Sequence, residues 1–479
     1  MDTPVKSTPS ATPTEVAEQA LYEVRKKIYP RAVRGKFAAW RWTFVLLTQL
    51  VFYGTPWLVW NDRQAVLFDL VSRKFYIFGL VFWPQDIVYL TVLLIISAYS
   101  LFLFTAVAGR LWCGFACPQT VYTEMFMWIE RMVEGDRLAR MKLDQKSLSG
   151  RKLRLKSAKH GLWIALALWT GFTFVGYFTP IHVLWREVLT LHTGPWETFW
   201  VLFYAFATYG NAGWMREQVC KYMCPYARFQ SVMFDPDTLI ITYDPERGEP
   251  RGSRGRSVDH KAKGLGDCVD CGICVQVCPT GIDIRNGLQY ECIGCAACID
   301  GCNQVMDKMG YPKGLIRYST EKAMQGHYST DRVLKRVFRP RVLVYTAILW
   351  LIIIAAAITL YHRVPVKVDV IRDRGNVMHG SDDPEVQNVY RLQIMNTQEI
   401  PRDVRIAVAG VKGIQLEIEP QPIRVPATSS RVVAVRVEAP RASLKSGSNR
   451  IDFTIEAVDP SHPGTAPLTI VEKAALVTP

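Results

Sequence analysis

The apolar residues of this chain gather in a few long runs. Five runs approach the roughly 20 residues that a helix needs to cross a bilayer, and they cover 43–60, 87–108, 161–180, 196–215 and 342–361. The first run is short and contains Pro56, whereas the last, VLVYTAILWLIIIAAAITLY, is uninterrupted. A further run, FYIFGLVFW at 75–83, is too short to cross. The pattern therefore predicts a five-helix transmembrane α bundle.

Beyond residue 366 the hydrophobic period changes to two. Val366, Val368 and Val370 alternate with polar residues, and the same alternation returns at 390–394, 404–408, 416–418, 433–437 and 451–455. Seven or eight short strands of this kind are typical of an immunoglobulin-like sandwich. This tail contains no cysteine, so it lacks the inter-sheet disulfide of antibody domains. Nothing catalytic stands out in it, so we expect it either to serve in binding or docking or to be a purely structural module.

The basic residues orient the predicted spans. They cluster before the first span and in the 109–160 connection, which contains RKLRLKSAK at 151–159. The positive-inside rule places the N-terminus, 109–160 and 216–341 in the cytoplasm. Five spans then put 366–479 on the other side, the periplasm of a bacterial inner membrane. The net charge of +14 arises in these flanks and accompanies no nucleic-acid motif, so no nucleic-acid partner is expected.

The N-terminal segment 1–36 is predicted to be disordered and basic. Its start, MDTPVKSTPSATPTE, is rich in proline, threonine and serine. It has no recognisable signal peptide, so none is expected.

All twelve cysteines precede residue 303, in or beside segments placed in the cytoplasm. Thiols in a reducing compartment suit metal ligation better than disulfides. Eight of them form two sets with the spacing C-x2-C-x2-C-x3-C, namely Cys268, Cys271, Cys274 and Cys278, then Cys292, Cys295, Cys298 and Cys302. This is the spacing of bacterial two-cluster ferredoxins, in which the fourth cysteine of each set binds the other cluster.

Two 4Fe-4S clusters are therefore expected. The first would be bound by Cys268, Cys271, Cys274 and Cys302, and the second by Cys292, Cys295, Cys298 and Cys278. Glycines such as Gly272 and Gly294 allow the backbone to approach a cluster closely. A pair of zinc sites is the alternative, and it fits the doubled register less well.

The other four cysteines form two C-x3-C-P motifs. They are Cys113 and Cys117 in GRLWCGFACPQT, then Cys220 and Cys224 in VCKYMCPYARF. The i, i+4 spacing places each pair on one helix face. Pro118 and Pro225 suit the first turn of a new helix, so PQTVYTEMFMWIERMVEG is expected to form an interfacial amphipathic helix.

We expect these four thiols to converge at the cytoplasmic ends of spans two and four as a catalytic, metal-binding surface. Nearby basic residues, Arg110, Arg216, Lys221 and Arg228, are expected to lower the thiol pKa values. Soft thiolates select Cu(I), zinc or iron–sulfur clusters. The residues leave open whether copper or a third cluster is bound, and buried cysteines without a ligand are the alternative.

No source of electrons is evident in the sequence. A G-x-G-x-x-G nucleotide motif and a C-x-x-C-H haem motif are both lacking. No histidine lies deep inside a predicted span, so a haem held between helices is not expected. His160, His182, His192 and His362 fall at span edges or in loops, where packing or solvation explains them.

Three further stretches complete the pattern: RKFYIFGLVFWPQD (73–86), GRLWCGFACPQTVYTEMFMWIER (109–131) and DTLIITYDPERGEPRG (237–252). With the C-x3-C-P pairs, the double cluster motif and the β tail, the chain resembles the FixG/RdxA/CcoG family of cytochrome oxidase accessory proteins. That resemblance implies copper delivery to haem–copper oxidases, cupric reductase activity, and a copper-transporting P-type ATPase and oxidase subunits as partners. A homodimer is a further option.

The expected fold class is a multi-domain membrane protein. Four transmembrane helices (37–235) precede a cytoplasmic ferredoxin-like insert with two clusters (236–335), a fifth span (340–361) and a periplasmic immunoglobulin-like sandwich (366–479). The leading hypothesis is electron transfer through the clusters to Cu(II), giving Cu(I) for oxidase assembly. The alternatives are a quinol-linked electron conduit without a metal substrate and a non-catalytic assembly scaffold.

Overall fold

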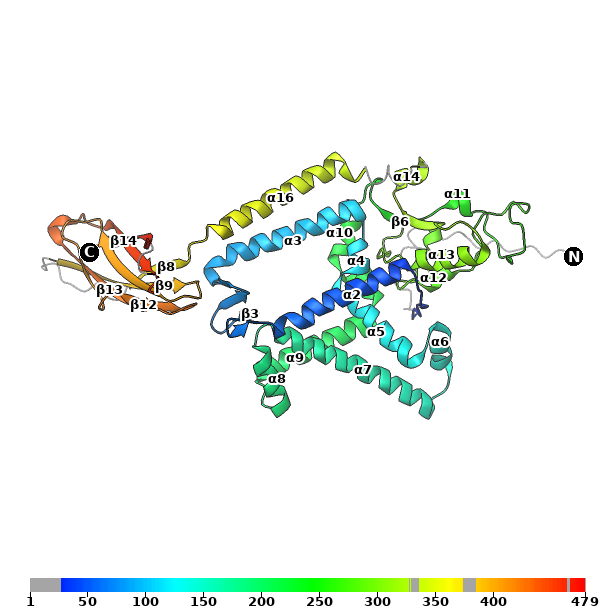
Figure 1. Cartoon of the computed structure of the whole chain (residues 1–479), viewed down its shortest axis with the longest axis horizontal. Helices are drawn as coiled ribbons and strands as arrows, with labels where there is room; N and C mark the ends of the chain where they lie inside the picture. The colour runs from blue at the N-terminus through cyan, green and yellow to red at the C-terminus, as the bar shows by residue number, and fades with distance from the viewer. Residues whose placement is uncertain (1–26, 327, 329–335, 374–384, 463–465, 479) are drawn as a thin grey trace, which may run out of the picture. The chain divides into compact units, whose positions relative to one another are not determined.

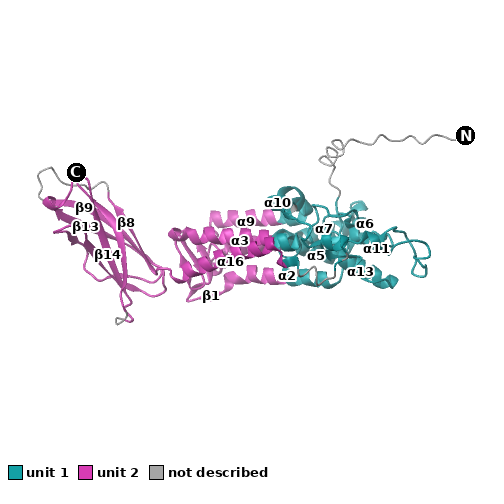
Figure 2. Cartoon of the chain, turned by 90° about the horizontal axis from the view of Figure 1, so that it is seen from above, with its two compact units in different colours: residues 1–45, 104–164, 209–337 teal, residues 46–103, 165–208, 338–479 magenta. Residues whose placement is uncertain are grey.

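The computed structural model of the chain describes residues 27–478, apart from 327, 329–335, 374–384 and 463–465. The chain divides into two compact units (Figure 2). The first contains residues up to 45 together with 104–164 and 209–337, and the second contains 46–103, 165–208 and 338–479.

The first unit joins short helices to a ferredoxin-like part. Its helices are α4 (Leu111–Phe115), α5 (Pro118–Glu134), α6 (Arg137–Gln145) and α10 (Pro225–Met233), with π-helical turns at Tyr209–Met215 and Val219–Met223. In the ferredoxin-like part, β6 (Ile240–Tyr243) pairs antiparallel with β7 (Ile316–Ser319). Helices α11 (Pro245–Gly248), α12 (Ile273–Gln276), α13 (Ala297–Met309) and α14 (Glu321–Gln325) complete it (Figure 1). Its core includes Ile241, Ile299, Met306 and Leu315.

The second unit contains helices, small sheets and the β tail. Helices α8 (Ile181–Thr190) and α9 (Pro195–Thr208) accompany α3 (Ile87–Ala108) and α16 (Pro340–Tyr361). The run at 75–83 forms β4 (Lys74–Ile77) and β5 (Leu80–Phe82), which pair with β3 (Val66–Asp69), while β1 (Val59–Trp60) pairs with β2 (Arg63–Gln64).

The tail is a sandwich of two four-stranded sheets, as predicted. The strands are β8 (Val366–Arg372), β9 (Glu385–Asn396), β10 (Arg402–Ala409), β11 (Gln415–Glu417), β12 (Ile423–Val425), β13 (Ser430–Pro440), β14 (Ser448–Val458) and β15 (Leu468–Val477). The sheet orders are β12-β10-β14-β15 and β11-β13-β9-β8. The alternating residues Leu392, Val435 and Phe453 are buried between them, which explains the period of two.

Two helices in the described part of the chain are long and apolar enough to cross a membrane, Pro84–Ala108 and Pro340–Tyr361. The other three predicted spans coincide with α2 (Lys36–Gly54), α7 (Gly150–Val175) and α9. Basic residues shorten the apolar part of α2 and of α7, and α9 has only 14 residues before the π-helical turn. The five-helix bundle therefore stays a prediction for these three.

The boundaries near the N-terminus also differ from the predicted ones. The first span was expected at 43–60, but α2 ends at Gly54, because Pro56 opens a 3-10 turn. Part of the segment expected to be disordered makes fixed contacts: Ala32 N donates to Asp136 and Arg31 N donates to the Gln276 carbonyl. The disorder prediction is therefore wrong for 27–36, and its remainder, 1–26, lies outside the described residues.

Candidate metal centres

Two cavities in the ferredoxin-like part are lined by groups of thiols. One, of about 340 Å³, is lined by Cys268, Cys271, Cys274 and Cys302. The other, of about 330 Å³, is lined by Cys278, Cys292, Cys295 and Cys298, with Cys274 also at its wall. Each cavity thus gathers three cysteines of one set and the fourth of the other. This crossed grouping is the one that the two-cluster ferredoxin spacing requires.

The two cysteine loops repeat the same backbone conformation. The second residue after the first cysteine has a positive φ in both, Asp270 at 50° and Gly294 at 68°. The fourth residue does too, Gly272 at 64° and Ala296 at 58°. Such left-handed positions bend the chain sharply. The bends let three successive thiols line one cavity, so the donor set and its cradle fit a 4Fe-4S cluster.

The thiols are placed for ligation, but Cys274 and Cys292 are poor acids by themselves. Burial raises the pKa of Cys274 to about 11 and the pKa of Cys292 to about 12. A bound metal is what stabilises buried thiolates. Among the described residues, no group of three or more cysteine, histidine or acidic side chains surrounds a single ion. A cubane does not require that arrangement, because each of its irons takes one cysteine.

The four C-x3-C-P thiols lie at breaks between helices. Gly109, at φ 54°, follows α3, and the short helix α4 then carries Cys113. Cys117 precedes α5, which begins at Pro118, and Cys224 precedes α10, which begins at Pro225. The predicted helix starts and the amphipathic helix 118–134 are confirmed.

The prediction that each pair shares one helix face is wrong. Helix α4 ends at Phe115, between Cys113 and Cys117. The π-helical turn that carries Cys220 ends at Met223, before Cys224. The residue before a proline rarely adopts helical geometry, so in both motifs the helix ends before the cysteine that precedes the proline. The thiols of each pair therefore sit on different elements.

The four thiols nevertheless lie within electrostatic range of one another. Burial raises the pKa of Cys220 to about 12, and charge on the other three thiols pushes this pKa in the same direction. Burial also raises the pKa of Cys113 to about 11, and charge on Cys117 adds to the rise. Cys113 Sγ donates to Gln230 Oε1 over 3.4 Å.

The expectation that basic neighbours lower the thiol pKa values is wrong in its net direction for Cys113, Cys117 and Cys220, whose pKa values burial raises. Arg110 does oppose the rise at Cys113, but burial outweighs it. Arg216 is bound to Glu130 over 3.1 Å, and Arg228 lies over the ring of Tyr290.

The thiol site abuts the loop of the second cluster. A Cβ on Gly114 would lie 2.8 Å from Cys295 N and Cα, so the two backbones are in direct contact. Cys113 and Cys220 pack against the apolar group of Val277, Ile293, Cys295 and Ala297. The candidate copper thiols are therefore adjacent to the second cluster's ligands.

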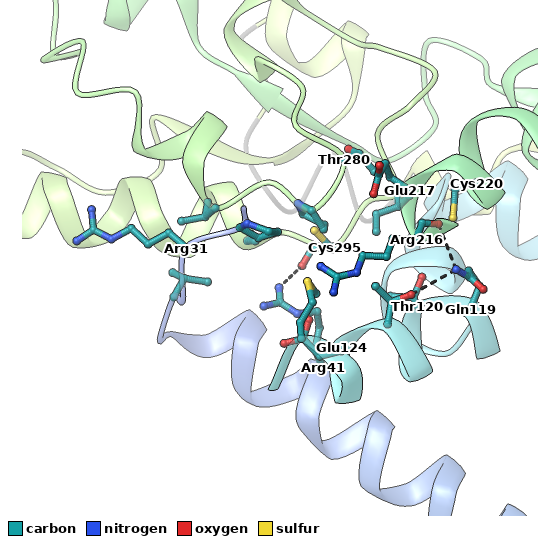
Figure 3. Close-up of a pocket in the computed structure, with 18 of the residues that line it drawn as sticks. Arg31, Arg41, Gln119, Thr120, Glu124, Arg216, Glu217, Cys220, Thr280 and Cys295 are labelled. Carbon is teal, nitrogen blue, oxygen red and sulfur yellow. Dashed lines mark hydrogen bonds between the residues drawn. The ribbon is translucent and has the colours of Figure 1, made fainter. Parts of the chain in front are cut away.

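A cavity of about 730 Å³ opens between these two sites (Figure 3). Cys220 and Cys295 both contribute to its wall. Arg41 donates to the Cys295 carbonyl over 2.6 Å, and Gln119 donates to the Arg216 carbonyl over 3.1 Å. Its other charged residues include three more arginines and two glutamates: Arg31, Arg131, Arg140, Glu124 and Glu217. The cavity is therefore predominantly basic.

Comparison with known families agrees with this arrangement. A "4Fe-4S dicluster domain" matches residues 215–321, and a "4Fe-4S binding domain" matches 90–137. Residues 356–475 match the "IG-like fold at C-terminal of FixG", whose description names an oxidoreductase. The chain is 37% identical to protein RdxA of Cereibacter sphaeroides, over 95% of this chain and 98% of RdxA. The chain belongs to the FixG/RdxA family.

A second member of the FixG/RdxA family is comparably similar. The nitrogen fixation protein FixG of Rhizobium meliloti is 38% identical over 84% of this chain and 82% of its own length. A crystal structure of a FixG-related protein from Vibrio parahaemolyticus matches 24% of this chain and 96% of its own chain, with 21% identity and a TM-score of 0.20. This FixG/RdxA chain is thus an iron–sulfur electron-transfer protein with a redox role, and its two apolar helices are consistent with a membrane protein.

Two contacts that position the sites in this FixG/RdxA chain were not predicted. Asp300 of α13 accepts hydrogen bonds from Ala38 N over 2.7 Å and Phe37 N over 3.3 Å, so it caps the N-terminus of α2. Glu130 is 1% exposed and binds Arg140 over 2.8 Å and Arg216 over 3.1 Å. The partners lie far apart in sequence, and the sequence carries no local signal for either contact.

Proposed function

We propose that this chain reduces Cu(II) to Cu(I) for the assembly of a haem–copper cytochrome c oxidase. The observation that carries the proposal is the packing of the C-x3-C-P thiols against the loop that holds Cys295. A soft-donor site beside an iron–sulfur centre suits a metal that is bound and reduced in the same place.

The residues divide into electron-transfer ligands and a copper site. When bound, the two 4Fe-4S clusters supply single electrons, and their proposed ligands are Cys268, Cys271, Cys274 and Cys302, then Cys292, Cys295, Cys298 and Cys278. The proposed copper ligands are Cys113, Cys117, Cys220 and Cys224. One electron converts one Cu(II) to Cu(I), which these thiolates favour.

Copper binding at this site is coupled to proton release. Burial and mutual repulsion raise the pKa of Cys113 and of Cys220, so the thiols carry protons before the metal binds. Copper must displace these protons, and affinity therefore rises with pH. Gln230, fully buried, orients the Cys113 thiol through its hydrogen bond.

We further propose that the chain is a multi-pass protein of the bacterial inner membrane, with the ferredoxin part in the cytoplasm and the β sandwich in the periplasm. Two apolar helices support the membrane location, and the basic residues of 109–160 favour a cytoplasmic side for that segment. The proposed partners are a copper-transporting P-type ATPase that takes up Cu(I) and subunits of the oxidase. A homodimer would be compatible with this scheme.

The test is copper binding and reduction by the purified full chain. A double variant, Cys117→Ser with Cys224→Ser, should bind less Cu(I) per chain than wild type. After its clusters are reduced chemically, it should also reduce Cu(II) more slowly. Tyr222→Phe is the matched control, because Tyr222 is 59% exposed in the same π-helical turn. If the double variant bound Cu(I) and reduced Cu(II) as the wild type does, copper would react elsewhere.

A further inference from the structure

The first unit has another large cavity that the proposed copper chemistry does not use. Its volume, including space open to solvent, is about 930 Å³, which is within the range of small-molecule sites. Its lining includes His160 and Trp163 of α7 and Gly213 and Trp214 of the π-helical turn. Helix α7 changes here from the basic run 151–159 to the apolar run that follows. The cavity is therefore placed where a lipid-soluble molecule could enter.

Aromatic rings form one wall of this cavity. The imidazole of His160 is stacked on Trp214, with ring centres 6.0 Å apart and planes inclined by 20°. It meets Trp163 edge-on at 5.2 Å. The hydroxyl of Tyr209 lies 2.9 Å from His160 Nδ1 and forms a hydrogen bond with it. The other ring nitrogen, Nε2, is therefore not engaged by Tyr209. The wall thus offers flat surfaces beside a nitrogen that can accept a proton.

The cations of the cavity are already compensated by carboxylates. Lys156 Nζ lies 3.0 Å from Glu134, and Lys159 Nζ lies 3.0 Å from the same carboxylate. Arg216 is paired with Glu130 over 3.1 Å. An anionic headgroup would have to displace these pairs, at a cost in buried charge. The lining therefore favours an uncharged aromatic ligand over a phosphate.

The cavity adjoins the candidate metal centres. Arg216 and Glu217 line both this cavity and the basic one that reaches Cys220 and Cys295. Arg216 has a positive φ of 41°, a strained conformation that clusters at functional sites. The π-helical turn beside it belongs to a class of distortion that is frequent at such sites. A Cβ at Gly213 would stand 3.3 Å from the Trp163 ring, so glycine leaves the wall open.

We propose that this cavity binds a hydroquinone that serves as the electron donor. This inference rests on the proposed function, since it names the reductant for the copper reaction. Oxidation of one hydroquinone to the quinone releases two electrons and two protons. The protons pass in turn to His160 Nε2 and on to solvent. With clusters held by the two cysteine groups around Cys268 and Cys292, the two electrons would be passed on singly, which balances the reduction of two Cu(II) to two Cu(I).

Binding can be measured without copper. Decylubiquinone is titrated calorimetrically into the detergent-solubilised full chain, in wild type and in His160→Gln, Trp214→Leu and His182→Gln. We expect one site per chain. Loss of the imidazole or of the stacked indole should each weaken binding about tenfold. His182→Gln is the control, because His182 also meets a tryptophan edge-on, Trp57, but does not line this cavity. Trp214, 55% exposed, can be replaced with little risk to folding.

A second measurement follows cluster absorbance after anaerobic addition of decylubiquinol. We expect reduction in wild type and in His182→Gln, and slow reduction in the other two. Absence of quinone binding, or equal affinity in all four proteins, overturns the proposal. So does displacement of decylubiquinone by phosphatidylglycerol in the micelles, which would mark a lipid site. Quinol reduction of the clusters without copper reduction would refute the proposed function and leave the donor site intact.

Discussion

A single methyl group added at Gly114 should disrupt the contact between this residue and the loop of the second cluster. In Gly114→Ala the new Cβ would lie 2.8 Å from Cys295 N, Cys295 Cα and Gly294 C. Favourable separations between carbon atoms are about 3.5–4.0 Å, so the backbones must part by roughly 1 Å. Neither side is a flexible side chain that could turn away. Overpacking of this kind costs about 1–3 kcal/mol.

The displacement falls between the thiols proposed to bind copper and the proposed ligands of the second cluster. A misplacement of about 1 Å can slow a reaction by about 100-fold, and we expect Gly114→Ala to reduce Cu(II) at least tenfold more slowly after chemical charging. Electron paramagnetic resonance of the reduced protein should show one altered cluster signal and one unchanged signal. Thermal loss of cluster absorbance should begin at a lower temperature.

The matched control is Gly150→Ala. Gly150 also lies in a helix, but a Cβ there would meet no atom within 4 Å. We expect this variant to match wild type in stability, spectrum and rate. Equal behaviour of Gly114→Ala and Gly150→Ala in all three measurements would refute the direct contact between the thiol site and the second cluster.

Four other changes have defined outcomes. Asp300→Ala should lower unfolding stability by about 1–2 kcal/mol because two α2 amides lose their cap, whereas Asp307→Ala, exposed on the same helix, should be neutral in denaturant titrations. Burial raises the pKa of Glu130, but the paired cations outweigh burial and hold this pKa low. The contribution of Glu130 to the free energy of unfolding should therefore be complete above about pH 4.3 and should be lost as acid protonates the group. Glu130→Gln should lower the free energy of unfolding by about 3–5 kcal/mol at neutral pH. Cys278→Ser should remove the electron paramagnetic resonance signal of the second cluster and leave that of the first unchanged. If ligation were not crossed, the signal of the first cluster would be lost instead. Deletion of 366–479 should leave both clusters spectroscopically intact, and cluster loss would show that the sandwich supports the ferredoxin part.

Much of this arrangement follows from local sequence patterns. The spacing around Cys268 and Cys292 predicts the crossed thiol groups, because short gaps restrict where successive thiols can point. The alternation in 366–479 predicts the sandwich, because one face of each strand is buried. Pro118 and Pro225 predict the starts of α5 and α10.

Contacts between distant segments could not be predicted in the same way. In the sequence, Asp300 is an ordinary polar residue of the α13 segment. Its role as a cap depends on the fold, which brings the backbone amides of α2 within hydrogen-bond distance of its carboxylate. The pKa values of the thiols depend on burial, which the charges of neighbours in sequence do not reveal. The i, i+4 spacing of Cys113 and Cys117 predicts a continuous helix, but it carries no signal for the break after Phe115.

The most direct test of the central claim is a single-turnover experiment on the full chain. Protein with both clusters reduced is mixed rapidly with Cu(II) under anaerobic conditions, and cluster oxidation and Cu(I) formation are followed together. We expect about two Cu(I) per chain, formed at the rate at which the clusters are oxidised, because each cubane carries one electron. We also expect loss of this fast phase in the variant with serine at 113, 117, 220 and 224. Fast, stoichiometric Cu(I) formation in that variant with its clusters intact would contradict the account.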